Sequence, residues 1–131
     1  MKITVLDAHG VNPGDISWEP LMPLGDVSIF EETGDGVDEE PSIDRIADSE
    51  IVITCKNYLG RKTFEKCQNI KMVAVLSTGY DVVDIQAASE HGVVVCNVPT
   101  YATDAVAQFV FALILELCHA VGKHDVSVHG G

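Results

Sequence analysis

The stretch of sequence that decides the fold lies at residues 51–76 and reads IVITCKNYLGRKTFEKCQNIKMVAVL. It holds two short apolar runs, at Ile51–Thr54 and at residues 72–76, separated by a segment of helical length at residues 60–67. Apolar runs without polar alternation are typical of strands buried on both faces, as in a parallel sheet covered by helices. The stretch therefore predicts one strand–helix–strand unit of a parallel sheet.

The same alternation of apolar runs and helical segments extends over the first hundred residues. Right-handed crossovers then place helices on both faces of the sheet, and ligands are expected outside the carboxyl ends of the strands. The predicted fold class is α/β, a flavodoxin-like, doubly wound, five-stranded parallel sheet of order 2-1-3-4-5. The further strands are predicted at residues 3–6, 27–30 and 93–96, and the further helices at residues 17–24, 38–47 and 83–91.

A long and unusually apolar helix is predicted at residues 103–121, where Thr103 or Asp104 can cap the first turn. A helix that is apolar nearly all round must be buried all round, so we expect it to pack against another domain or another subunit. The polar residues 123–131 are typical of a linker or loop. The chain is accordingly divided into a sheet domain at 1–100, an interdomain helix at 101–122 and a connection at 123–131.

Length and charge exclude several classes of function. The 131 residues suffice for one domain, and the formal net charge of -12 would repel a nucleic-acid backbone. No apolar run approaches the roughly 20 residues that cross a bilayer, and Asp7 comes too early for a signal peptide. We therefore expect a soluble, cytoplasmic protein without a nucleic-acid or membrane partner. The densest acidic stretch, residues 31–40, is interrupted by glycines and predicts a solvated surface loop.

Several chemical motifs are absent. The cysteines lack zinc spacing, so we expect no metal site and reduced, mostly buried thiols, at Cys55, Cys67, Cys96 and Cys118. No strand is followed by Gly-x-Gly-x-x-Gly, and no Gly-x-Ser-x-Gly elbow occurs. A phosphoacceptor domain would explain Asp7, but the third strand ends in Thr54-Cys55-Lys56 without an aspartate. The sequence offers neither a dinucleotide loop nor a covalent nucleophile.

The turn Ser77-Thr78-Gly79, after the fourth strand, is the candidate binding element. Successive N–H groups in a glycine-containing turn that leads into a helix can receive a small carboxylate. The alternative is an ordinary connection in which Gly79 supplies a positive φ. After the fifth strand, Asn97-Val98-Pro99 forms the elbow into the apolar helix.

These motifs together resemble the amino-terminal portion of the D-isomer-specific 2-hydroxyacid dehydrogenases. The resemblance rests on Gly79-Tyr80-Asp81-x-x-Asp84, Gly92-Val-x-Val, Asn97-Val98-Pro99 and Thr103-x-x-Val106-Ala107, in this order. Residues 12–18 are similar to the glycerate dehydrogenase, or hydroxypyruvate reductase, branch. The resemblance implies a flavodoxin-like substrate domain into which a Rossmann domain is inserted. The catalytic Arg, Glu and His would then lie downstream, and none of them is in this chain.

The resemblance also implies roles for individual residues. The Ser77-Thr78-Gly79 turn would bind the substrate carboxylate, and Lys56 and Asn57 would line the same pocket. Ala102 and Val106 would border the nicotinamide ring, and Gln108 replaces the more usual Glu.

The expected parent is a homodimer that uses NAD or NADP to reduce hydroxypyruvate or glyoxylate. The isolated chain is expected to be inactive and to bind no cofactor. The alternative is a stand-alone flavodoxin-like interaction module that dimerises through residues 103–121.

Overall fold

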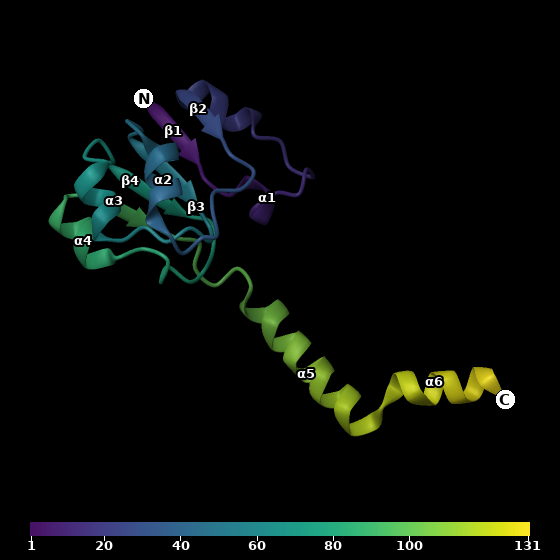
Figure 1. Ribbon diagram of the computed structural model, residues 1–131. Coiled ribbons are helices and arrows are strands. Elements are labelled where there is room, and N and C mark those ends of the chain that lie inside the picture. The colour runs from purple at the N-terminus through teal and green to yellow at the C-terminus, as the bar shows by residue number, and fades with distance from the viewer. The chain divides into compact units, whose positions relative to one another are not determined.

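The computed structural model describes residues 1–131, which form two compact units, Met1–Pro99 and Thr100–Gly131. The first unit is built on a parallel sheet of five strands in the order β2-β1-β3-β4-β5 (Figure 1). This order confirms the predicted fold class. The strands are β1 (Lys2–Val5), β2 (Asp26–Ile29), β3 (Ile51–Thr54), β4 (Met72–Val75) and β5 (Val94–Cys96).

Helical segments connect the strands, as predicted. The segment predicted as a helix at residues 17–24 is instead the 3-10 helix η1 (Glu19–Leu24). Pro20 and Pro23 lie within it, and because proline has no N–H group to donate, a regular α-helix is disfavoured there. The α-helices of this unit are α1 (Ala8–Val11), α2 (Glu39–Ile46), α3 (Arg61–Lys66) and α4 (Ile85–Glu90).

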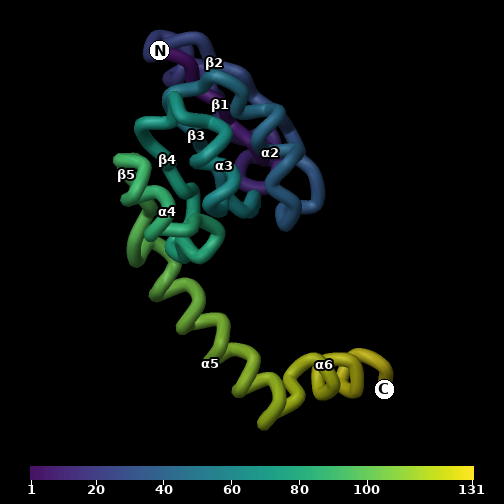
Figure 2. The backbone as a smooth tube through the Cα atoms, turned by 60° about the vertical axis from the view of Figure 1, so that its left-hand side comes forward, coloured from purple at the N-terminus to yellow at the C-terminus, as the bar shows by residue number.

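Apolar side chains are buried on both faces of the sheet. Neighbouring strand residues point to opposite faces, so Val52 joins the cluster under α2, α3 and α4, whereas Ile53 joins a second cluster. The three helices lie in a row over one face, α2 beside α3 and α3 beside α4 (Figure 2). The other face has the smaller cluster, in which Trp18 and Leu21 pack on the strands. Coverage of the two faces is therefore unequal.

The acidic stretch at residues 31–40 is more than the solvated loop that its composition predicts. Asp38 caps α2, and the carboxylate of Glu39 reaches across to α3, where it accepts hydrogen bonds from the amides of Gly60 (2.8 Å) and Thr63 (2.9 Å). The Thr63 hydroxyl donates to the same oxygen, at 2.6 Å. Thr33 is buried, and its hydroxyl donates to the Leu6 carbonyl. Residues 31–38 are thus a largely exposed loop, as predicted, but the contacts of this stretch also join elements distant in sequence.

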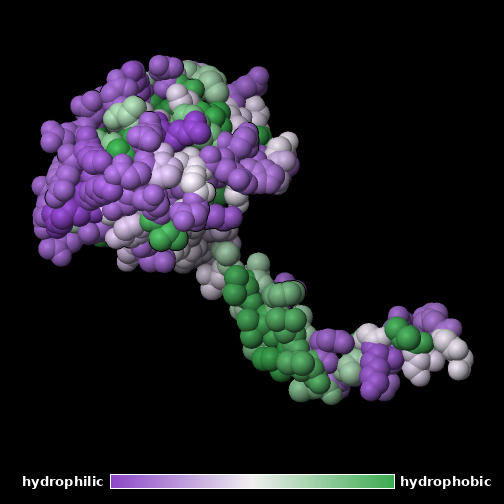
Figure 3. All heavy atoms as spheres, in the orientation of Figure 1, coloured by the Kyte–Doolittle hydropathy of each residue, from purple (hydrophilic) through white to green (hydrophobic).

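The second unit consists of α5 (Thr103–His119) and α6 (Val121–Gly130). The two helices are bent by 51° at Ala120, which has left-handed backbone angles. The predicted loop at residues 123–131 is therefore helical as far as Gly130. The segment contains no proline, so its polar composition alone did not prevent a helix. The side chains of α5 are largely apolar, as the hydrophobic colour of this helix in Figure 3 shows.

No single helix is long and apolar enough to cross a membrane. Taken together, the bent pair α5 and α6 has the length and the composition of a membrane span.

The contact between Glu39 and α3 gives a stability prediction. Gly60 has no side chain to cap α3, so Glu39→Ala leaves the first amides of that helix without their acceptor. We expect the free energy of unfolding to fall by about 1–3 kcal/mol. Urea denaturation followed by circular dichroism measures this change.

Glu65→Ala is the matched control, because Glu65 is an exposed acid on α3 whose carboxylate makes no hydrogen bond or ion pair. Its effect should stay within about 0.5 kcal/mol. A Glu39→Ala effect no larger than that of the control would contradict the capping role.

Candidate functional site

The turn after β4 is held on both sides by its neighbours. On one side, the Leu59 amide donates to Val82 O (2.8 Å), and the Asp84 amide donates to Leu59 O (2.9 Å). On the other side, the Asn97 side chain donates to Thr78 O (2.8 Å), and the Val98 amide donates to Ser77 O (3.1 Å). The parallel sheet places these segments next to one another because all of them follow the carboxyl ends of adjacent strands.

Both hydroxyl groups of the turn take part in this framework. Ser77 Oγ donates to Gly79 O (2.6 Å), and Thr78 Oγ1 donates to Val98 O (3.2 Å). The backbone N–H groups of Ser77, Thr78 and Gly79 have no acceptor within the protein. Thr78 and Gly79 are exposed, and Ser77 is half-buried. The turn therefore has three successive amide donors that the protein itself does not use, an arrangement that suits an anionic ligand.

Two details of this turn differ from the sequence-based expectation. Gly79 does not have a positive φ, so backbone freedom does not explain the glycine. A Cβ at this position would lie 3.0 Å from Oδ1 of Asp81, an exposed side chain that would have to turn away. In addition, α4 begins only at Ile85, and its Ala87 amide already donates to Asp84 Oδ1 at 2.9 Å. The free donors belong to the turn itself and not to the helix terminus.

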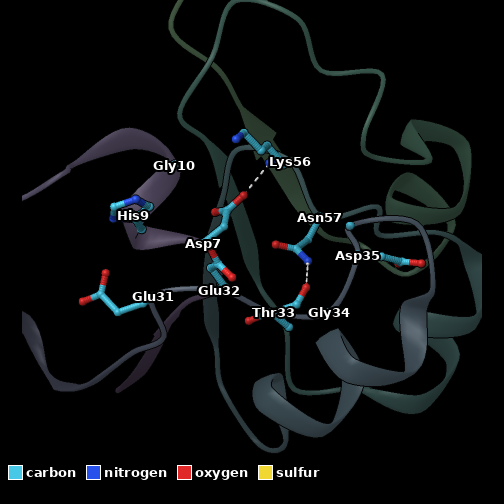
Figure 4. Close-up of a pocket in the computed structure, with 11 residues that line it drawn as sticks. Asp7, His9, Gly10, Glu31, Glu32, Thr33, Gly34, Asp35, Lys56 and Asn57 are labelled. Atoms are coloured by element: carbon cyan, nitrogen blue, oxygen red, sulfur yellow. Dashed lines mark hydrogen bonds between the residues drawn. The ribbon is translucent and has the colours of Figure 1, made fainter.

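The segment after β3 is fixed by Asp7, which follows β1. The Asp7 side chain is buried, and its carboxylate accepts hydrogen bonds from the amides of Cys55 (3.0 Å) and Lys56 (2.5 Å). Figure 4 shows the contact with Lys56. Asp7 therefore links the segments that follow β1 and β3.

Lys56 and Asn57 line a cavity of about 280 Å³ at this edge of the sheet. Much of the remaining wall comes from the acidic stretch, and no residue of the Ser77–Gly79 turn takes part. Lys56 and Asn57 follow β3, the neighbour of the strand that leads into the turn. The cavity that they line contains no residue of the turn, so the structure does not bring these residues and the turn together in one pocket. The other lining residues are Asp7, His9, Gly10, Glu31, Glu32, Thr33, Gly34, Asp35 and Gly36.

Asn57 has a structural contact that its sequence position did not reveal. Its side chain is 2% exposed, and its Nδ2 donates to the Thr33 carbonyl at 2.5 Å. Sequence reasoning also missed the acidic wall of the cavity, formed in part by Glu31, Glu32 and Asp35. Their position shortly after β2 could have signalled it, because β2 ends at the same edge of the sheet as β1 and β3.

The cysteines are less buried than predicted. Only Cys67 is buried, Cys55 is half-buried, and Cys96 and Cys118 are exposed because they lie on the edge strand β5 and on α5. Burial, and secondarily the Asp7 carboxylate, raises the pKa of the Cys55 thiol, whereas burial raises that of Cys67. Cys55 thus carries a neutral thiol beside the cavity and is not an activated nucleophile.

The predicted nicotinamide neighbours lie in the second unit. Ala102 is half-buried and precedes α5, and Val106 lies in the first turns of that helix with 59% of its surface exposed. Gln108 is exposed on the same helix. All three residues belong to the second unit, Thr100–Gly131.

Comparison with known proteins relates this arrangement to a family. A hydroxypyruvate reductase of Blautia hydrogenotrophica is 50% identical over 131 residues, which are 100% of this chain and 40% of that protein. The solved structure of an acyclic imino acid reductase (Bsp5), in complex with NADPH and D-Arg, has a TM-score of 0.81 at 28% identity and matches 100% of this chain and 41% of its own.

A NAD-dependent formate dehydrogenase of Staphylococcus aureus, solved with NAD, has a TM-score of 0.73 at 26% identity and matches 99% of this chain and 42% of its own. The chain thus spans about two fifths of the length of these three proteins. The family model described as "D-isomer specific 2-hydroxyacid dehydrogenase, catalytic domain" matches residues 3–121. The chain therefore belongs to the D-isomer-specific 2-hydroxyacid dehydrogenase family.

Proposed function

We propose that the chain is the substrate-binding portion of a longer oxidoreductase that reduces hydroxypyruvate or glyoxylate to the D-2-hydroxy acid with NAD(P)H. The 50% identity to a hydroxypyruvate reductase supports this substrate class. The observation that carries the proposal is the set of three free amides at Ser77, Thr78 and Gly79. In this proposal residues 1–100 are the substrate domain, residues 101–122 the interdomain helix and residues 123–131 the start of the connection to the cofactor domain.

The free amides of the turn would hold the carboxylate of the 2-keto acid. Backbone amides suit this task because they carry partial positive charge and have no proton to lose at neutral pH. Lys56, whose ammonium makes no ion pair within the protein, adds positive charge at the same sheet edge. The side chains of this turn are occupied in bracing it, so its geometry is set before the ligand arrives.

The remaining chemistry would come from outside this chain. Reduction of the keto group needs a proton donor, a cation near the carbonyl oxygen and the hydride that the nicotinamide supplies. Residues 1–131 contain no Gly-x-Gly-x-x-Gly turn that could hold a dinucleotide. Ala102 and Val106 could offer the cofactor only van der Waals contact. One solved relative holds NADPH and another NAD, so the proposal leaves both cofactors open.

The free thiols fit a reducing compartment, and we propose a cytoplasmic location.

The proposed reaction is tested by NADH and NADPH oxidation. Hydroxypyruvate and glyoxylate should support turnover by the longest natural protein that contains this sequence. The 131-residue chain alone should give none, because it lacks the acid–base residues. No turnover by the longer protein would contradict the proposed function and would favour the stand-alone interaction module. Turnover by the purified 131-residue chain would show that the chemistry lies within it.

Gly79→Val tests the turn within the longer protein. A branched side chain would meet Asp81 and crowd the three amides, so we expect the KM for hydroxypyruvate to rise by about tenfold or more while the Kd for NADH changes little. Gly130→Ala is the matched control, since a Cβ there would meet nothing within 4 Å. Equal losses of substrate and cofactor binding by Gly79→Val would indicate a purely structural turn.

We further propose that a second copy of the chain covers α5. Eight apolar side chains of this helix are between 48% and 85% exposed, and each gains about 1.5–3 kcal/mol when fully buried. A two-fold pair is the commonest way for a protein to bury such a surface on itself. The eight side chains are those of Val106, Phe109, Val110, Phe111, Leu113, Ile114, Leu115 and Leu117.

Light scattering measures this association directly. We expect the 131-residue chain to be a dimer or larger at tens of micromolar, and the double variant Leu113→Glu/Leu117→Glu to shift it toward the monomer. Ser127→Glu, an exposed change on α6, is the control and should leave the mass unaltered. A folded monomer of the unaltered chain at that concentration would contradict the proposal.

A further inference from the structure

The directions of two free amides in the turn are set by hydrogen bonds to the carbonyls of the same peptides. The peptide bond is planar and trans, so its C=O and N–H groups point in opposite directions. The Thr78 carbonyl accepts from Asn97 Nδ2 at 2.8 Å, and the Ser77 carbonyl accepts from the amide that follows Asn97 at 3.1 Å. Both carbonyls therefore face the segment after β5. The N–H groups of Thr78 and Gly79 belong to these two peptides and point away from that segment.

The two peptides differ in what holds them. The Ser77 carbonyl is bound by the backbone amide of Val98, and the Thr78 hydroxyl donates to the carbonyl of the same residue at 3.2 Å. The Thr78 carbonyl, in contrast, has the Asn97 side chain as its only donor within the protein. The direction of the Gly79 N–H thus depends on a single side chain.

Without that side chain, the peptide between Thr78 and Gly79 could rotate. Type I and type II turns differ by a rotation of this kind, in which a carbonyl and an N–H exchange sides. The rotated form gives the residue after the peptide a positive φ, which glycine adopts without steric cost. Both residues are exposed, so water would solvate the carbonyl in either direction. The rotated peptide would turn the partial negative charge of the Thr78 carbonyl toward a bound carboxylate.

We propose that Asn97 is a positioning residue for the carboxylate anchor, because it holds the Thr78–Gly79 peptide with its N–H group turned toward the ligand. The inference rests on the proposed function, since it takes the turn at Ser77–Gly79 to be that anchor. Asn97 acts through this peptide and does not itself bind the ligand. It directly follows β5, and the parallel pairing of β5 with β4 places its half-buried side chain beside the turn.

Steady-state kinetics of the longest natural protein that contains this sequence test the role of Asn97. Asn97→Ala should raise the KM for hydroxypyruvate about fivefold, as the loss of one orienting hydrogen bond allows. The kcat and the Kd for the cofactor should change little, because the side chain acts only on the carboxylate anchor. Asn69→Ala is the matched control, since Asn69 is exposed, makes no side-chain hydrogen bond and precedes β4 at the opposite end of that strand.

A second substitution separates rotation of the peptide from general damage to the turn. Gly79→Ala adds one Cβ, whose nearest neighbour is Oδ1 of Asp81, an exposed side chain that can turn away. Alanine resists the positive φ that the rotated peptide requires. In a Gly79→Ala background, Asn97→Ala should therefore raise the KM by less than about twofold. Equal effects of Asn97→Ala in the two backgrounds would overturn the inference and would indicate that Asn97 only stabilises the turn.

The outcomes separate this inference from the function on which it rests. A KM of Asn97→Ala no higher than that of Asn69→Ala would overturn the positioning role, while turnover by the unaltered protein would leave the proposed function standing. If Asn97→Ala does not fold, Asn97→Asp keeps the side-chain volume without offering Thr78 a donor, and it should raise the KM at least as much. Failure of both variants to fold would overturn the inference in favour of a structural role. If the unaltered protein shows no turnover, the proposed function fails and the inference fails with it.

Discussion

The parallel pairing of β3 with β4 is the constraint on which the rest of the site depends. Thr54 lies opposite Val75 in this pair, so both chains leave the sheet at the same edge and in the same direction. The segments that follow then bond to each other through Leu59, Val82 and Asp84. The turn at Ser77–Gly79 is held in place because the segments on both sides of it are fixed by the sheet.

In the proposed function, these contacts allow a small turn without helix-terminus donors to offer an anion site. The hydroxyls of Ser77 and Thr78 and the amide of Asn97 make the internal bonds of the turn, which leaves three backbone N–H groups for a ligand. On the neighbouring strands, the Asp7 carboxylate performs the equivalent task by holding the amides of Cys55 and Lys56. Polar side chains at this edge thus mainly fix the backbone, and in the proposed function the unpaired backbone amides do the binding.

The sheet could be predicted from the sequence because near-continuous apolar runs depend on local composition alone. The turn at Ser77–Gly79 could be located for the same reason, since it directly follows such a run. The partners of Asn57 and Glu39 could not be predicted. Asn57 contacts Thr33, 24 residues away, and Glu39 contacts Thr63, also 24 residues away. Contacts of this kind are set by the fold and leave no local pattern, so the composition of the acidic stretch predicts its exposure but not its contacts.

The proposal that the turn amides anchor the substrate carboxylate is tested most directly by a crystal structure with a bound 2-hydroxy acid. We expect the carboxylate oxygens to lie about 2.7–3.2 Å from the backbone nitrogens of Ser77, Thr78 and Gly79. A carboxylate bound away from these nitrogens, with the turn amides still facing solvent, would contradict it.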